Sequence, residues 1–370
     1  MATHVTANTD ATPALPKVLV AKEGAVMRLT LNRPAALNAF DDEMRQVLGD
    51  EIPKIARNPD VYVVVLGSTS SKAFCAGGDV RALIKIAATD RARARGYFAG
   101  EYYLDWLLDC FSKPTVSLID GLCMGSGAGL TLYNTHRVAG ENYRFGMPET
   151  AIGLFPDVGV AHVLARLPWP IGIYLGLTGR TIGRADAHWL GLASHCIGAG
   201  AFEGIVAALA DAQTIDPLLD GLHEAQAMGP VQAEQSRIAD LFGADSITEI
   251  LAALERASAK GDAFAAETLK DLRKRSPMSL AITDRHIRRA RTLDLRETLI
   301  QDYRLAVRCL ENVDFAEGVR AVLIDKDHAP KWQHRRVEDI TEDEIVAYFA
   351  ALGDDELVLP TRAEMQTARV

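Results

Sequence analysis

The chain has 370 residues, of which 48% are hydrophobic and 24% are charged, as in an ordinary globular protein of one large domain or two smaller ones. Its formal net charge of -9 disfavours non-specific binding to nucleic acid or to an anionic membrane, although a local basic patch could still hold an anionic small ligand. The five cysteines are scattered without a CxxC or Cys/His spacing, so no metal site is predicted, and a reducing compartment, the cytoplasm or an organelle matrix, fits best.

The first 16 residues have neither the basic-then-apolar pattern of a secretory signal nor the arginines of a transit peptide. They are predicted to be a disordered lead-in. No apolar run approaches the roughly 20 residues that span a bilayer, so no membrane association is expected.

Strands and helices alternate in the first half of the chain. Residues 25–31 alternate in polarity and predict a strand, which Pro34 terminates. Residues 41–56 predict a helix with acidic residues in its first turn, and the β-branched run 61–66 predicts a strand buried on both faces. Further predicted elements are a helix from about Asp79, a helix over 91–111, a strand over 115–119, a helix from Gly125, and strands near 137–139 and 143–145. Strands separated by helices predict a parallel or mixed sheet with helical crossovers.

From about residue 203 helical periodicity dominates, as in residues 247–257, 263–275 and 293–310, and residues 337–352 predict one more helix. The sequence therefore predicts a βα core over residues 17–202, a helical C-terminal region over 203–357 and a tail over 358–370.

The segment AFCAGGD, residues 73–79, lies between a predicted buried strand and a predicted helix. Its two glycines let the backbone approach another group closely, and N–H groups at the start of a helix favour developing negative charge. The N–H of Gly78 is therefore a candidate donor, although a tight strand-to-helix turn explains the same glycines. Cys75 has no evident basic partner and is a poor candidate for a nucleophile.

The segment GLCMGSGAG, residues 121–129, also lies between a strand and a helix. It lacks the third glycine of a dinucleotide-binding fingerprint, because Leu130 stands in that place. A second backbone donor near Ser126 is the favoured interpretation, since two such turns could face one carbonyl group.

The segment MPETAIGLFPDVG, residues 147–159, places Glu149 and Asp157 eight residues apart in an otherwise apolar stretch. Carboxyl groups held among apolar groups have raised pKa values and become useful acids or bases. The pattern alone equally allows both residues to be helix caps.

These three motifs, in this order and spacing, resemble the crotonase (enoyl-CoA hydratase/isomerase) superfamily, and the resemblance covers residues 17–357. It implies an α/β crotonase (ClpP-like) fold, a spiral core of repeated ββα units with an extended helical C-terminal region. It also implies that the N–H groups of Gly78 and Ser126 form an oxyanion hole for an acyl thioester. One such donor typically lowers the reaction barrier by about 3 kcal/mol.

Within the superfamily, hydratases carry catalytic glutamates at the positions of Gly129 and Glu149, and here only the second is present. The string PETAIGLFPD, which ends on Asp157, is similar to the 3-hydroxyisobutyryl-CoA hydrolase branch. That branch usually has glycine where Ser126 stands. Two further segments carry the same likeness, GVRAVLIDKD at residues 318–327 and PKW at residues 330–332.

The resemblance implies a hydrolase of short β-hydroxyacyl-CoA thioesters that acts in valine breakdown, with a related hydratase or isomerase as the alternative and a non-catalytic acyl-CoA-binding protein as a third. Glu149 would be the nucleophile or the general base, Asp157 would assist proton transfer, and Glu101 would contact the substrate. The predicted contacts to CoA are Arg33, Ala35, Leu37, Lys72 and Ala73. Arg33 and Lys72 would meet phosphate, and solvated surface charge explains either one equally well. No cofactor besides the substrate's own CoA is expected, and a trimer or hexamer would fit the family.

Overall fold

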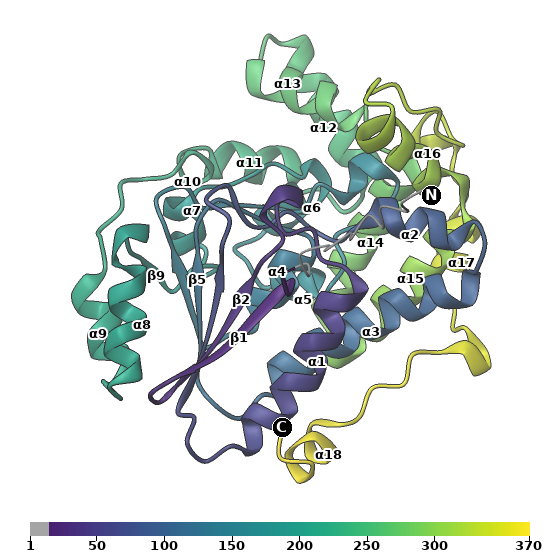
Figure 1. Ribbon diagram of the computed structural model, residues 1–370. Coiled ribbons are helices and arrows are strands. Elements are labelled where there is room, and N and C mark those ends of the chain that lie inside the picture. The colour runs from purple at the N-terminus through teal and green to yellow at the C-terminus, as the bar shows by residue number, and fades with distance from the viewer. Residues whose placement is uncertain (1–14) are drawn as a thin grey trace, which may run out of the picture.

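The computed structural model describes residues 15–370, and its strands form two sheets (Figure 1). The larger sheet has the order β1-β2-β3-β5-β7-β9 and the smaller one the order β4-β6-β8. β1 pairs antiparallel with β2, and the other strand pairs are parallel. The strands are β1 Val18–Glu23, β2 Val26–Leu31, β3 Val63–Ser68, β4 Ala73–Cys75, β5 Thr115–Ile119, β6 Leu122–Met124, β7 His136–Ala139, β8 Arg144–Gly146 and β9 His195–Cys196. The predicted disordered lead-in falls almost wholly outside the described residues.

The chain passes repeatedly from the large sheet to the small one. β3, β5 and β7 are followed within a few residues by β4, β6 and β8, and a helical segment comes after each pair. These segments are α2 Val80–Ala87 with α3 Arg91–Cys110, then α4 Ser126–Leu132, then the 3-10 turn Glu149–Ile152 with α5 Val160–Leu164. This order is the predicted spiral of ββα units, and it stacks the turns after β4 and β6 side by side.

Helices cover both faces of the large sheet. The run in β3 is buried on both sides as predicted, because Val63 and Val65 face one cluster of apolar side chains, and Val64 and Leu66 face another. Figure 1 shows α8 (Phe202–Ala210) and α9 (Ile215–Leu222) lying along one face, where their apolar side chains complete the first cluster. The helices α1, α3 and α15 (Leu295–Glu311) lie on the other side and belong to the main core.

Several predicted boundaries agree with the structure because capping residues define them. α1 spans Asp42–Arg57, and the Asp41 side chain accepts a hydrogen bond from the Met44 N–H at 3.1 Å. The single helix expected over residues 337–352 is wrong. A 3-10 turn, Val337–Asp339, is followed by the separate helix α17, Glu342–Phe349, because Thr341 and Glu344 form a capping box that starts a new helix.

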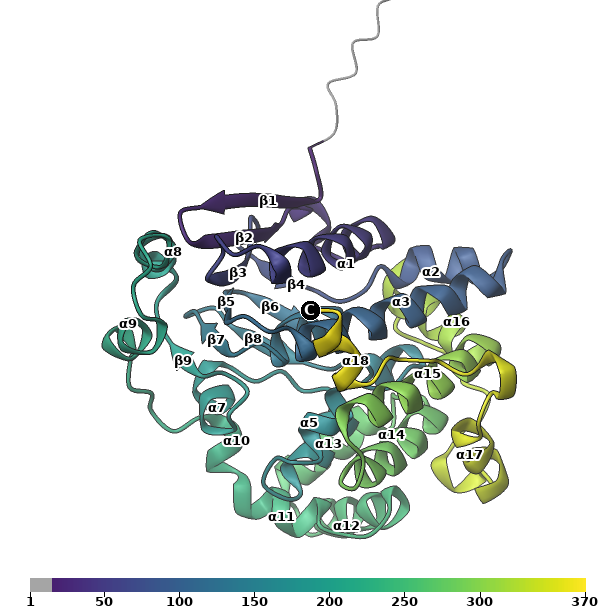
Figure 2. The same cartoon turned by 90° about the horizontal axis from the view of Figure 1, so that it is seen from below.

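The C-terminal helices pack onto the βα core and share its apolar interior. They are α10 Pro230–Ala233, α11 Gln235–Phe242, α12 Ile247–Ala259, α13 Ala263–Leu272, α14 Pro277–Ala290 and α16 Val313–Val319, and α6 Ile171–Thr178 and α7 Arg184–Trp189 precede them. The segment predicted as a tail ends in α18, Arg362–Thr367, which lies against α3 (Figure 2). There the indole N–H of Trp106 donates to the Pro360 carbonyl at 2.8 Å, and Arg362 pairs with Asp109.

Across residues 15–370, no helix has the combined length and apolar character that a membrane crossing requires.

Candidate active site

A cavity of about 180 Å³ lies where the turns after β4 and β6 meet the 3-10 turn at Glu149. Five residues predicted from separate stretches of the chain line this one cavity. They are Gly78, Glu101, Ser126, Glu149 and Asp157. The rest of the lining is mainly apolar and includes Tyr97, Phe98 and Leu154.

The two glycine-containing turns touch each other. Gly125 has φ +49°, and a Cβ added there would lie 3.2 Å from Gly77 Cα and 3.9 Å from Gly78 N, so both the backbone angle and the close approach require glycine. Ser126 opens α4, where the first N–H groups of a helix lack partners within the helix. Within residues 15–370, neither the Gly78 N–H nor the Ser126 N–H donates to a protein acceptor. The arrangement can offer two backbone donors to one oxygen atom.

Glu149 lies beside these donors and is 7% exposed. A Cβ at Gly125 would be only 3.1 Å from its Oε1, and its Oε2 is buried without a hydrogen-bond partner among the described residues. Burial raises the pKa of this carboxyl to about 8, and the positive charge of Arg275 opposes part of the shift. Pro148 occupies the capping position of the turn, so the interpretation of Glu149 as a helix cap is wrong.

Glu101 reaches the cavity from the middle of α3 and is 4% exposed. Burial raises the pKa of its carboxyl, while the nearby Ser126 side chain opposes the rise, and Glu101 Oε1 is buried without a hydrogen-bond partner among the described residues. The Ser126 Oγ lies 3.2 Å from where a Cβ on Gly78 would stand. The serine hydroxyl therefore lies between the backbone donors and the Glu101 carboxyl.

Asp157 is held by its neighbours in a strained loop. The Tyr102 hydroxyl donates to its Oδ2 at 2.8 Å. Val158 has φ +54°, an uncommon angle for a β-branched residue. The Tyr133 hydroxyl donates a hydrogen bond to the Val158 carbonyl at 2.6 Å. Burial, followed by the charges of nearby carboxyl groups, raises the pKa of Asp157 well above its usual range. α5 begins after Gly159 without a side-chain cap, so Asp157 is not a helix cap either.

Sequence reasoning missed the buried groups that support this loop. Asp302 on α15 accepts the Gly159 N–H at 2.6 Å and the His286 Nε2 at 2.5 Å, and the other ring nitrogen of His286 contacts Gln301 at 2.6 Å. The sequence does contain a signal for Asp302. This residue lies on the same helical face as apolar residues three and four positions away, and a carboxylate buried on such a face needs a partner because an unpaired one would be costly.

A side chain at the position of Gly129 would require the Asp105 carboxyl to move. A Cβ there would lie 2.5 Å from Asp105 Oδ1 and 3.0 Å from Val158 Cβ. Asp105 is fully buried one helical turn after Glu101, and burial raises its pKa well above the usual range. The sequence reasoning missed Asp105 as well as Asp302. Asp105 lies against the position at which a hydratase carries its first glutamate.

The residues predicted to contact CoA lie near the first turn but do not line the cavity. Ala35 is exposed on the 3-10 turn Pro34–Ala36, and the Leu37 carbonyl accepts the Ala76 N–H at 3.1 Å. Ala73 is buried in β4, and the exposed Lys72 has no carboxylate partner among the described residues. These roles in CoA binding stay predictions.

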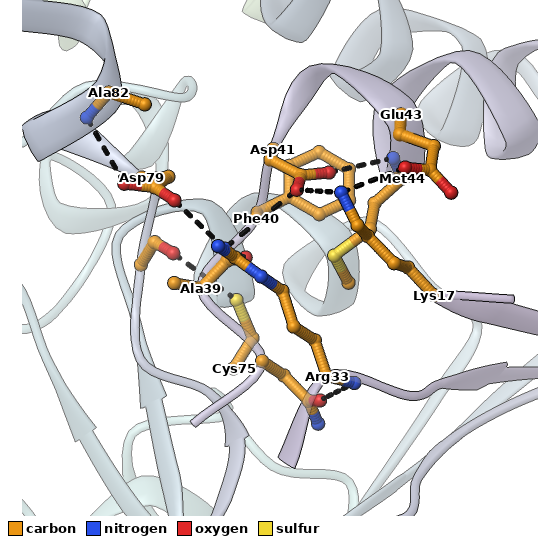
Figure 3. A network of polar contacts seen from close by, with 12 residues as sticks. Lys17, Arg33, Ala39, Phe40, Asp41, Glu43, Met44, Cys75, Asp79 and Ala82 are labelled. Atoms are coloured by element: carbon orange, nitrogen blue, oxygen red, sulfur yellow. Dashed lines mark hydrogen bonds and ion pairs between the residues drawn. The ribbon is translucent and has the colours of Figure 1, made fainter. Parts of the chain in front are cut away.

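Arg33 is already engaged within the protein, as Figure 3 shows. Its guanidinium donates to the Ala39 carbonyl and to Asp79 Oδ2, both at 2.9 Å, and lies 3.8 Å from Asp41 Oδ2. This network fixes the position of Asp79, the N-cap residue of α2, next to Gly78. The nearby Cys75 is fully buried, and burial raises the pKa of its thiol, in line with the prediction that it is not a nucleophile.

Comparisons with known proteins agree with this geometry. The model of the enoyl-CoA hydratase/isomerase family matches residues 26–349. The chain belongs to the enoyl-CoA hydratase/isomerase family. The chain is 38% identical over 351 residues to the mitochondrial 3-hydroxyisobutyryl-CoA hydrolase of Xenopus tropicalis, with 92% of this chain and 90% of the relative covered. It is 35% identical over 356 residues to the human mitochondrial 3-hydroxyisobutyryl-CoA hydrolase, with 94% and 92% covered. The predicted resemblance to this branch is confirmed.

Two solved structures share the fold. A crystal structure described as an enoyl-CoA hydratase from Rhodobacter sphaeroides has a TM-score of 0.87 and 38% identity, covering 93% of this chain and all of that one. Another, described as a carnitinyl-CoA dehydratase from Mycobacterium thermoresistibile, also has a TM-score of 0.87, with 34% identity and 92% and 98% covered. The crotonase fold predicted from the motifs is therefore confirmed, while the printed names divide between hydrolases on one side and a hydratase and a dehydratase on the other.

Proposed function

We propose that this enzyme hydrolyses a short β-hydroxyacyl-CoA thioester, 3-hydroxyisobutyryl-CoA, to 3-hydroxyisobutyrate and CoA, a step of valine catabolism. The observation that carries the proposal is the placement of Glu149 beside two unengaged backbone N–H groups in a small buried cavity. A cavity of about 180 Å³ suits a short acyl group.

In the proposed mechanism the thioester carbonyl oxygen accepts hydrogen bonds from the N–H groups of Gly78 and Ser126, which stabilise the charge that develops on it. Glu149 either attacks the carbonyl carbon to give a mixed anhydride, which water then hydrolyses, or removes a proton from the attacking water. The carbon–sulfur bond breaks and the sulfur takes up a proton. Asp157 suits the role of proton donor, because burial and the nearby carboxyl groups raise its pKa well above its usual range, which favours the protonated form.

Hydration of an enoyl-CoA is the alternative, and the names of the two similar structures favour considering it. Hydratases use two glutamates, and here the first position is Gly129, which has no carboxyl group and lies against the Asp105 side chain. The missing first glutamate favours hydrolysis and agrees with the relatives named as hydrolases.

For the nucleotide end of the substrate, we propose contacts at Arg33, Ala35, Leu37, Lys72 and Ala73, with no cofactor besides the CoA of the substrate. Lys72 has the stronger case as a phosphate partner, because the guanidinium of Arg33 already meets Asp79 and Asp41. A homo-oligomer, trimer or hexamer, remains part of the proposal. The cytoplasm is the proposed location, and the five buried free thiols fit a reducing compartment of this kind, as they would fit an organelle matrix.

The direct test of the function is a free-thiol assay over a panel of acyl-CoA thioesters. We expect CoA release from 3-hydroxyisobutyryl-CoA, with 3-hydroxypropionyl-CoA as the nearest competitor. Loss of enone absorbance from crotonyl-CoA without thiol release would instead support a hydratase, and binding without turnover across the panel would support a non-catalytic acyl-CoA-binding protein.

Ser126 should influence which acyl group is preferred. In Ser126→Gly the hydroxyl between Gly78 and Glu101 disappears, so we expect kcat/KM for 3-hydroxyisobutyryl-CoA to fall about threefold to tenfold, the effect of one hydrogen bond, with a smaller loss for bulkier acyl groups. Ser126→Ala removes the hydroxyl but keeps Cβ. Comparing it with Ser126→Gly separates the effect of the lost hydroxyl from the effect of the added space in the cavity. Unchanged kcat/KM ratios across the panel in both variants would show that the hydroxyl has no part in specificity.

A further inference from the structure

A second and larger cavity, of about 600 Å³, lies among the C-terminal helices and the turn Val337–Asp339. Its volume falls within the range of about 300 to 1,000 Å³ that is typical of small-molecule sites. Apolar side chains from α12, α13 and α14 form much of its wall, including Leu251, Leu269, Leu272 and Leu280. The proposed hydrolysis places no reacting group in this cavity, although the charge of Arg275 in its lining lowers the pKa of Glu149.

Four arginines and two glutamates also line this cavity. Two of the arginines are neutralised locally, because Arg273 pairs with Glu255 at 2.7 Å and Arg336 pairs with Glu338 at 3.2 Å. The cavity therefore carries a surplus of positive charge from the other two arginines, although the whole chain has a net charge of -9.

The other two arginines are Arg275 and Arg335, and neither forms an ion pair among residues 15–370. Arg275 donates to the Thr178 carbonyl at 2.6 Å, while its Nε is buried without a hydrogen-bond partner. Both arginines line the cavity without a carboxylate partner among the described residues, and a planar carboxylate pairs with a guanidinium group with good geometry.

The wall behind Arg275 separates this cavity from the candidate active site. The Ser276 N–H donates to the Thr150 carbonyl at 3.1 Å, so the segment that carries Arg275 is bonded directly to the turn that begins at Glu149. The two cavities share no lining residue. A molecule in the larger cavity would not occupy the acyl site, so both could be filled at once.

We propose that this cavity binds an organic acid, a carboxylate with an apolar body, whose carboxylate lies between the guanidinium groups of Arg275 and Arg335 and whose apolar part lies against the leucines. This site goes beyond the proposed hydrolysis and does not depend on it.

The test is calorimetric titration of the full-length protein with octanoate. We expect saturable binding of one octanoate per chain, unaffected by saturating CoA and at least about tenfold weaker for the neutral analogue octanamide, since a charge-assisted contact is lost. Arg335→Gln, at the exposed edge of the cavity, should weaken octanoate binding about tenfold. Arg256→Gln is the matched control, because this exposed arginine of α12 does not line the cavity and changes the net charge equally.

Three results would overturn the proposal: no saturable binding in the millimolar range, displacement of octanoate by CoA, or equal affinities of the Arg335→Gln and Arg256→Gln variants. Hydrolase activity is not the readout, so failure of the thiol-release assay would leave this test intact.

Discussion

Glu149→Gln should lower the rate of CoA release from 3-hydroxyisobutyryl-CoA by at least about a thousandfold, in the range that removal of a general base or nucleophile produces. Binding of the acyl-CoA should stay within a few-fold, because the amide has nearly the same shape and the two backbone donors remain. The measurements are single-turnover thiol release and the Kd of the substrate. Glu267→Gln is the control, an exposed glutamate of α13 that meets Arg180 at 3.3 Å, and it should leave both values unchanged.

The pH dependence offers an independent check on Glu149. Its carboxylate form is the reactive one in either mechanism, and its pKa is about 8, so activity should rise as pH increases through about 8. The Glu149→Gln variant should lack this rise in its residual rate. Substantial hydrolysis by the variant, with the same pH profile, would remove Glu149 from the mechanism.

The same carboxyl group should reduce stability at alkaline pH. Burial raises its pKa from an ordinary value of 4.5 to about 8 in the folded protein, so the folded state binds the proton more tightly than the unfolded state. The contribution to the free energy of unfolding is therefore fully present below about pH 4.5 and is lost as pH rises to about 8. Glu149→Gln should consequently be more stable than the parent above pH 8, by up to about 5 kcal/mol from the 1.36 kcal/mol that each pKa unit represents.

The larger features of the fold were predictable because their sequence signals are local and strong. β3 begins with three consecutive valines, and the start of α1 has an N-cap at Asp41. The strands of the small sheet were harder to predict. β4 and β6 have three residues each, too few to show a periodicity, and their pairing is set by contacts between residues about 50 apart in the chain.

In the candidate site too, residues with a local sequence signal were predicted and residues defined by long-range packing were not. Motifs on loops identified Gly78, Ser126 and Glu149, because glycine pairs and carboxylates in apolar surroundings stand out in a sequence. The groups that position Asp157 were not identified, since Tyr102 and Asp302 lie within regular helices and gain their significance only from packing across the core. Arg275 is similar, because its unsatisfied Nε is visible only in three dimensions.

Asp157→Gly should slow hydrolysis by about a hundredfold, the lower end of the range for loss of an acid–base group, with little change in acyl-CoA affinity. Asp157→Asn is the sharper variant, because it keeps the size of the side chain and the strained neighbour Val158 in place while removing the ionisable carboxyl. The checks are the free-thiol rate and the Kd for acyl-CoA in the same preparations.

Tyr102→Phe tests how much the position of the Asp157 carboxyl matters, separately from its ability to transfer a proton. This variant removes the 2.8 Å hydrogen bond to Asp157 Oδ2 but keeps the carboxyl, so its rate should lie between those of the parent and of Asp157→Asn. The hydrogen bonds from Gly159 N–H to Asp302 and from Tyr133 to the Val158 carbonyl still hold the backbone of the loop in this variant. Equal turnover by the parent and Asp157→Asn would exclude the Asp157 carboxyl from proton transfer, and the carboxylate chemistry would then rest on Glu149 with Glu101.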